Sequence, residues 1–253
     1  METININSVG QYKILEFDEL DSTNMFALCN VDNAVDGTII VAKHQTNGRG
    51  RLSRCWIGEK SGNVYMSIIL KPENFNTYPA LNVTQYMSVV VVRVLKQYYG
   101  VNAQIKWPND VLVDGAKIAG ILAETSIKNN RVNAIVLGLG LNVNLSEKVI
   151  KSIDKKATSL KMLLNREFDV SECIKHLSDE FFRNYDRFIE QGFSYIRDEY
   201  IAKSCFLNKK MKIENTSAPQ GEYFISSVDG NGMLVALDDK NVEQTVISGD
   251  LIC

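Results

Sequence analysis

The chain has 253 residues, of which 45% are hydrophobic and 23% charged, and these values are typical of a folded globular protein rather than a disordered one. Its 28 Lys and Arg residues against 30 Asp and Glu residues give a net charge of −2, which argues against a generally basic nucleic-acid-binding protein and leaves anion binding to a local cluster. The five scattered cysteines contain no Cys-x-x-Cys pair, so they predict reduced thiols rather than a zinc or redox motif.

The N-terminal segment carries acidic residues and lacks the apolar run of a signal peptide. The longest strongly apolar stretch, residues 87–95, is too short to span a bilayer. We therefore expect a cytoplasmic protein without membrane contacts.

Hydrophobic patterning predicts a mixture of strands and helices in the first 144 residues. Ser22 is a candidate N-cap for a short helix, and apolar residues at helical spacing predict a long helix over 78–99. Runs of β-branched residues broken by Gly, Asn and Asp predict strands over 39–43, 64–70, 118–124 and 134–139.

The pattern then becomes helical over 155–203. Steps of three and four residues predict one amphipathic helix with a single apolar stripe, formed by Ile174, Leu177, Phe181, Tyr185 and Phe188. Gly192 is expected to interrupt it before a second helix that runs through Tyr200. From Asn208 onward short alternating strands are expected over 211–213, 223–225, 233–235 and 245–247, with a hairpin turn at 229–232. Together they predict a small barrel.

The segment 43–58 concentrates positive charge, because it holds one lysine and three arginines and no acidic residue before Glu59. Gly48 and Gly50 flank Arg49 and allow the backbone to approach a ligand closely. Such a loop suits phosphate, since each guanidinium offers fork-shaped donors that match phosphate oxygens. The alternative is a solvated surface loop.

Two further segments are candidates for a site. The Asp114-Gly115 turn places Lys117 at the mouth of an apolar strand, where it either reaches an anion or keeps its amine in water. Gly138 and Gly140 lie where a strand can pass close to a ligand, although the spacing is not that of a dinucleotide-binding fingerprint. For Trp107 simple core burial is the preferred interpretation.

Six segments taken together resemble the biotin protein ligases, also called biotin–[acetyl-CoA-carboxylase] ligases. They are DSTN at 21–24, QTNGRGR at 45–51 followed by Arg54 and Trp56, GNVYMS at 62–67, KWPNDVLV at 106–113, KIAGILAE at 117–124 and GLGLNVN at 138–144. The resemblance is dense over 15–145 and looser through ATSL at 157–160 into the C-terminal strands. One departure is Leu52-Ser53, where many relatives carry Arg-Gly after GRGR; it removes none of the charged contacts.

The resemblance implies an α/β fold, with a mixed sheet packed with helices in a class II synthetase-like catalytic domain at residues 1–205 and a small SH3-like β-barrel at 206–253. It implies that biotin and Mg²⁺·ATP react to biotinyl-5′-AMP and pyrophosphate, and that biotin then passes to a lysine of a biotin carboxyl carrier protein. Neither a metal ion held by protein ligands alone nor a DNA partner is expected, and the resemblance leaves open whether the chain is a monomer or a homodimer.

The resemblance also implies the site residues. Lys117, Arg51 and Arg49 are the expected catalytic residues, which offset the repulsion between a carboxylate and a triphosphate. The residues expected to contact biotin or ATP are Ser22, Thr23, Asn24, Gln45, Gly48, Arg49, Gly50, Arg51, Arg54, Trp56, Lys117, Gly120, Gly138 and Asn142. Residues 22–24 and Gln45 are assigned to biotin, Trp56 to adenine or the valeryl chain, and Asn142 to the adenine edge. A helix cap is the alternative for residues 22–24. Asp250 lies in the matching terminal segment without an assigned role.

The sequence argues against three alternative functions. A DNA-binding repressor needs an extra domain of roughly 60 residues, whereas only 20 residues precede Asp21 and these are not basic. A lipoate or octanoate ligase shares a similar fold, but its usual Arg-Arg-x-x-Gly-Gly-Gly type of loop is absent here. A biotin-binding protein without catalysis has no need of three arginines and a lysine directed at phosphates.

Overall fold

A mixed eight-stranded sheet forms the centre of the computed structural model, which describes residues 5–9, 12–60, 62–71, 79–153, 156–216 and 221–252. Its strand order is β1-β2-β3-β4-β8-β7-β6-β5. Only β2 and β3 pair in parallel, and the other neighbours are antiparallel. The strands are β1 (Asn5–Val9), β2 (Tyr12–Phe17), β3 (Thr38–Ala42), β4 (Asn63–Leu70), β5 (Gln104–Lys106), β6 (Asp110–Val113), β7 (Ala116–Lys128) and β8 (Arg131–Asn142).

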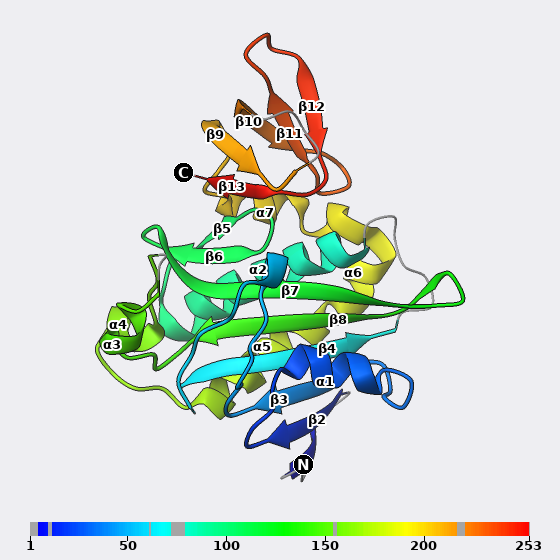
Figure 1. Ribbon diagram of the computed structural model, residues 1–253, viewed down its shortest axis with the longest axis vertical. Coiled ribbons are helices and arrows are strands. Elements are labelled where there is room, and N and C mark those ends of the chain that lie inside the picture. The colour runs from blue at the N-terminus through cyan, green and yellow to red at the C-terminus, as the bar shows by residue number, and fades with distance from the viewer. Residues whose placement is uncertain are drawn as a thin grey trace.

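Helices cover both faces of this sheet (Figure 1). The helix α1 (Thr23–Asn30) packs against β3, β4 and β8 over a small core, whereas α2 (Pro79–Tyr99) and α5 (Val170–Arg183) cover the opposite face over the main core. The other helices are α3 (Glu147–Ile150), α4 (Leu160–Leu164), α6 (Tyr185–Gln191) and α7 (Arg197–Lys203). None of the helices that the structure describes is both long and apolar enough to cross a membrane.

The predicted strands and helices are largely confirmed. Ser22 caps α1 by accepting a hydrogen bond from the Met25 backbone N–H, and the Asp114-Gly115 turn joins β6 to β7. Of the long helix predicted over 78–99, Tyr78 lies outside the described residues, as does Lys155 in the helical segment. Strands β7 and β8 are longer than predicted, because they continue past the core into an exposed hairpin through Asn129 and Asn130.

The prediction of one continuous helix through the apolar stripe is wrong. Helix α5 ends at Arg183 and α6 begins at Tyr185, since Asn184 has non-helical backbone angles (φ −130°, ψ 13°). The break lets residues from both helices reach the main core. Phe181 from α5 and Phe188 from α6 both pack against the Tyr86 ring, the latter with ring centroids 4.4 Å apart.

Five antiparallel strands follow α7, in the order β12-β11-β10-β9-β13. They are β9 (Lys209–Glu214), β10 (Glu222–Val228), β11 (Leu234–Leu237), β12 (Glu243–Val246) and β13 (Asp250–Ile252). Figure 1 shows this C-terminal sheet, in orange and red, at one end of the molecule beside β5, β6 and α7. The predicted hairpin turn at 229–232 joins β10 to β11.

That turn fastens the C-terminal sheet to the main domain. Two buried amides of α2 donate to its backbone: Asn82 Nδ2 to the Asn231 oxygen and Gln85 Nε2 to the Gly232 oxygen, each at 2.7 Å. Gly232 has a φ of +84°, and a Cβ atom there would meet the Gln85 amide. The junction therefore depends on a glycine at this position.

We predict that Gly232→Ala lowers the free energy of unfolding by about 2 kcal/mol or more, because alanine is strained at positive φ and displaces a buried hydrogen bond. Urea unfolding followed by circular dichroism measures the effect. Gly230→Ala is the matched control in the same turn, since a Cβ atom there meets nothing within 4 Å. Equal destabilisation by both substitutions would contradict this explanation.

Candidate active site

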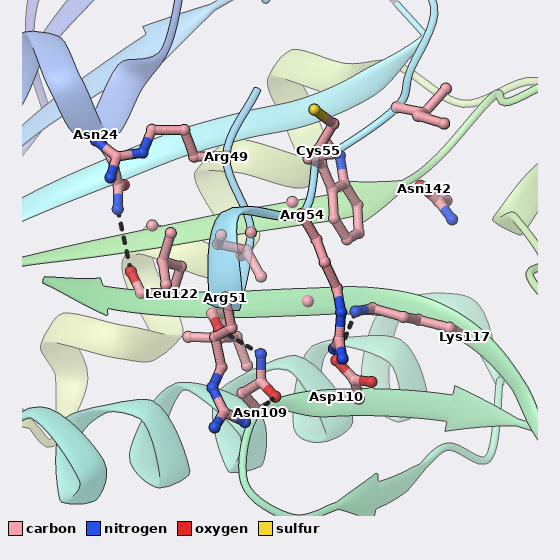
Figure 2. A pocket seen from close by; sticks show the side chains of 18 of the residues that line it. Asn24, Arg49, Arg51, Arg54, Cys55, Asn109, Asp110, Lys117, Leu122 and Asn142 are labelled. Carbon is pink, nitrogen blue, oxygen red and sulfur yellow. Dashed lines mark hydrogen bonds and ion pairs between the residues drawn. The ribbon is translucent and has the colours of Figure 1, made fainter. Parts of the chain in front are cut away.

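A cavity of about 540 Å³ opens on the α1 face of the sheet, between the segment 43–58, which we call the arginine loop, and β13. Every residue predicted to contact a ligand lines it, except Gly48. Figure 2 shows that Arg49 lies beside Asn24, whereas Arg51 and Arg54 extend toward Asn109 and Asp110. The cavity therefore has two ends of different chemistry, which we call the polar end and the cationic end.

Glycines on two paired strands form the floor between these ends. Gly120 of β7 pairs with Gly140 of β8. Gly138 lies two residues before Gly140 on β8 and therefore on the same face of the sheet. The Trp56 indole lies against the first pair: a Cβ atom on Gly120 would come within 2.7 Å of its Cζ3 atom, and one on Gly140 within 2.6 Å of Cζ2. Any larger residue would displace the indole, so these glycines allow the arginine loop to approach the sheet.

Hydroxyl and amide groups line the polar end. Gln45 Oε1 accepts hydrogen bonds from the Thr23 backbone N–H at 2.8 Å and from its hydroxyl at 3.1 Å. Ser67 Oγ lies 2.7 Å from Thr23 Oγ1 and 2.6 Å from Asn24 Oδ1. Ser22 caps α1, and residues 22–24 all line the cavity, so the helix-cap and ligand-site interpretations are compatible. Ser67 ends the GNVYMS segment but was not predicted as a site residue, because a serine in an apolar strand gives no indication of which groups its hydroxyl faces.

Arg49 is held at this polar end. Its Nη2 atom lies 3.0 Å from Glu124 Oε1, and its Nη1 atom contacts the Met25 sulfur. Glu124 also accepts a hydrogen bond of 2.9 Å from Asn24 Nδ2. The charge cluster expected around phosphate is therefore divided, with Arg49 separated from the other two arginines of the loop.

Lys117 occupies the cationic end. Its amine lies 2.5 Å from Asp110 Oδ1 and 5.3 Å from the centroid of the Trp56 ring. The side chain is 28% exposed, so the amine faces the cavity rather than bulk water. Asn109, in the turn just before Asp110, is held by hydrogen bonds of 2.9 Å in both directions with the Ile121 backbone. This turn places a carboxylate directly beside the lysine.

Asp250 closes the cationic end from the C-terminal sheet. Its two oxygens accept hydrogen bonds from Arg51 Nη1 at 2.9 Å and Arg54 Nη2 at 2.8 Å, and Asn215 Nδ2 adds a third at 3.1 Å. Arg51 also donates to the Gly249 oxygen at 3.1 Å and to Asn109 Oδ1 at 3.3 Å. Burial raises the pKa of Asp250, but the two guanidinium groups outweigh burial, so the pKa lies below its usual range.

Trp107 and Asn142 are both buried side chains that line the cavity. Trp107, in the KWPND segment, is buried, as the sequence indicated, and it also lines the cavity. Asn142 is buried, donates to the Thr158 oxygen at 3.0 Å and lies 3.5 Å from the Asn63 amide. Its amide is therefore already engaged within the protein, and its predicted contact with adenine stays a prediction.

Comparisons with known proteins place these features in a family. The Biotin/lipoate A/B protein ligase family matches residues 15–142. The chain is 36% identical over 249 residues to the bifunctional ligase/repressor BirA of Bacillus subtilis, covering 96% of this chain and 74% of that protein. It is 28% identical to the biotin–[acetyl-CoA-carboxylase] ligase of Paracoccus denitrificans, covering 85% of this chain and 90% of that one.

A solved structure, the biotin protein ligase from Aquifex aeolicus in complex with biotin and ATP, is similar with a TM-score of 0.80 and 25% identity, covering 94% of this chain and 97% of that chain. Among the ligase/repressors the coverage is uneven: the chain spans 58% of the Bacillus spizizenii protein and 38% of the Escherichia coli protein.

The Asp250 ion pairs should make stability depend on pH. A carboxylate whose pKa is lower in the folded chain stabilises it fully above the unfolded pKa of about 3.9, and this contribution is lost as pH falls through the folded pKa. We predict that Asp250→Asn lowers the free energy of unfolding at pH 7 by about 1–3 kcal/mol, and that the difference from wild type narrows below pH 4.

Urea unfolding of both proteins between pH 7 and pH 3 measures that difference. Asp198→Asn is the control, because the Asp198 side chain is fully exposed. A difference that stays constant down to pH 3 would show that the Asp250 charge is not what the arginines require.

Proposed function

We propose that this chain, which belongs to the Biotin/lipoate A/B protein ligase family and is a ligase, activates biotin with ATP. In a second step it transfers the biotin to a lysine of a biotin carboxyl carrier protein. The observation that carries the proposal is the division of one cavity into a polar end, where Thr23, Asn24 and Gln45 meet, and a cationic end around Lys117. An acid with a polar ring at one end of an apolar chain and a carboxylate at the other fits a cavity with a polar end and a cationic end.

The first step joins two anions. A biotin carboxylate oxygen attacks the α-phosphorus of ATP, a bond forms to give biotinyl-5′-AMP, and pyrophosphate leaves with the bonding electrons. Repulsion between close charges costs on the order of 4 kcal/mol per pair at an effective dielectric near 20. Lys117 and the two arginines paired with Asp250 supply the compensating charge, and they act by electrostatic stabilisation and positioning.

The second step transfers the biotinyl group. The neutral amine of the carrier lysine attacks the carbonyl carbon of the mixed anhydride, AMP leaves, and the amine proton is lost to solvent. The anhydride must be shielded from water until then. The arginine loop supports that role, because Trp56 covers the glycine floor and Arg51 connects the loop to the C-terminal sheet.

Magnesium fits the cationic end as a companion of ATP. Mg²⁺ commonly binds one or two carboxylates together with substrate phosphates, and Asp110 presents a carboxylate beside Lys117. The ion would neutralise phosphate charge there. The described residues contain no group of three His, Cys, Asp or Glu side chains that could hold a metal by themselves.

A cytoplasmic location agrees with Cys29, Cys55 and Cys173 being thiols, since reducing compartments keep cysteines unpaired. Transfer to the carrier of an acetyl-CoA carboxylase is supported by the name of the Paracoccus relative. The resemblance is compatible with both a monomer and a homodimer.

The family name covers both biotin and lipoate ligases, so the choice of biotin as the proposed substrate depends on the polar end of the cavity. Polar groups left facing a hydrocarbon tail lose their hydrogen-bond partners, and sites built for hydrogen bonding discriminate strongly against such ligands. We predict that ATP–pyrophosphate exchange requires biotin, with kcat/KM at least about 100-fold lower for lipoate and octanoate.

Purified protein with Mg·ATP and each acid in turn tests this substrate assignment. A preference for lipoate would keep the adenylation chemistry but replace biotin as the substrate. Tight biotin binding without exchange for any acid would favour a binding protein without catalysis.

We predict that Lys117→Ala slows adenylate formation about 100- to 1,000-fold, because the amine stabilises charge that develops at the α-phosphate. Biotin affinity should change less than about threefold, since the amine lies at the cationic end. Single-turnover kinetics and calorimetry measure the two effects.

Lys128→Ala is the matched control for this substitution. Lys128 lies on the same strand, in an exposed ion pair with Asp32, and its loss should alter neither quantity. Equal losses of rate and of biotin affinity in Lys117→Ala would assign the lysine to binding alone.

A further inference from the structure

Glu124 connects the arginine loop to α1 with its two carboxylate oxygens. Oε1 pairs with Arg49 Nη2 at 3.0 Å, and Oε2 accepts a hydrogen bond from Asn24 Nδ2 at 2.9 Å. The side chain is only 20% exposed, so both interactions are partly shielded from water. Glu124 lies on β7 four residues after Gly120, on the same face of the strand as the cavity floor.

These bonds decide which atom Asn24 offers to a ligand. One amide hydrogen is donated to Glu124 and the other to the Leu122 oxygen at 3.2 Å. Its Oδ1 atom lies 2.6 Å from Ser67 Oγ and is the first atom that a Cβ atom added to Gly138 would meet; Gly138 also lines the cavity. An amide oxygen has two lone pairs, and one remains after the bond with Ser67. Asn24 therefore presents an acceptor to the cavity.

We propose that Glu124 is a positioning residue for substrate selection: by holding both hydrogens of the Asn24 amide away from the cavity, it selects an acid whose ring carries N–H donors. A cyclic urea, as in biotin, has such donors, whereas a dithiolane ring or a fatty chain has none. The inference rests on the proposed function and adds to it the residue that sets the direction of the hydrogen bond.

A glutamate is required at this position, since Arg49 and Asn24 both donate. Arg49 and Asn24 meet different oxygens of Glu124, and a glutamine replaces one of these oxygens with an NH₂ group, so in this arrangement one of the two partners faces a donor. The guanidinium carries a full charge and competes better for the remaining oxygen. In Glu124→Gln, Asn24 then faces another donor, and its amide must turn or move.

The test compares the KM values of Glu124→Gln and wild type for biotin, desthiobiotin and ATP. Desthiobiotin keeps the cyclic urea and lacks the sulfur ring. We expect KM for both ureido acids to rise about tenfold or more, because a buried ureido N–H loses its acceptor, and KM for ATP and kcat to change less than about threefold. Glu167→Gln is the matched control, because Glu167 forms one exposed pair with Lys161.

A second background separates positioning from general structural damage. In Arg49→Met the competing donor is gone, so a glutamine at 124 can serve Asn24. Glu124→Gln should therefore weaken biotin binding less than about threefold in that background, measured by calorimetry. An undiminished effect there, an equal rise in KM for ATP, or unchanged KM for biotin in the single variant would each overturn the inference.

Failure of the proposed function is a distinct result. It would be seen in the wild type, as absent biotin binding and absent biotin-dependent exchange, before any variant is compared. Normal wild-type turnover with an indifferent Glu124→Gln variant would remove this inference alone.

Discussion

The arrangement of the site depends on carboxylates that neutralise the basic side chains facing the cavity. The pairs are Arg49 with Glu124, Lys117 with Asp110, and both Arg51 and Arg54 with Asp250. Gathered in a partly closed space, four positive charges would repel one another and push the loop outward. Internal anions remove that repulsion and keep the guanidinium groups directed inward. A bound phosphate must therefore compete with the protein's own carboxylates for these basic side chains. Its affinity depends on how much more strongly the side chains interact with the phosphate than with the carboxylates.

Small residues are the second requirement, because the loop must come close to the sheet for these pairs to form. The Gly120–Gly140 pair leaves room for the Trp56 indole, and the indole in turn lies over the Lys117 amine. Hydrophobic packing and charge pairing thus fix the same loop from two sides. The polar end adds neutral hydrogen bonds between Thr23 and Gln45, which hold the start of the loop beside α1.

The sequence predicts best those features that short segments determine. Turns such as Asp114-Gly115, the Ser22 cap and the β-branched strands depend on local conformational preferences, and the structure contains them. The break at Asn184 was missed because the apolar stripe continues in register across it, and only packing against Tyr86 distinguishes two helices from one. The cavity lining followed from motif resemblance, since the residues that meet there come from segments far apart.

Most of the site contacts that the sequence does not predict join residues that are distant in the chain. Asp250 lies 199 positions from Arg51, and a lone aspartate near the end of a chain carries no signal of its own. Glu124 ends the KIAGILAE motif, but the motif does not indicate its role, because that role depends on where the side chains of Arg49 and Asn24 point. Side-chain direction of this kind depends on strand register, which shifts to the other face with a slip of a single residue.

The position of Asp250 explains why the C-terminal sheet must be held rigidly. Its carboxylate serves Arg51 and Arg54 only if β13 keeps its distance from the arginine loop, and a shift of about 1 Å would weaken both hydrogen bonds. The buried amides of Asn82 and Gln85 provide that constraint at the opposite corner of the C-terminal sheet. Residues from both sides of the predicted boundary between residues 205 and 206 therefore build the site.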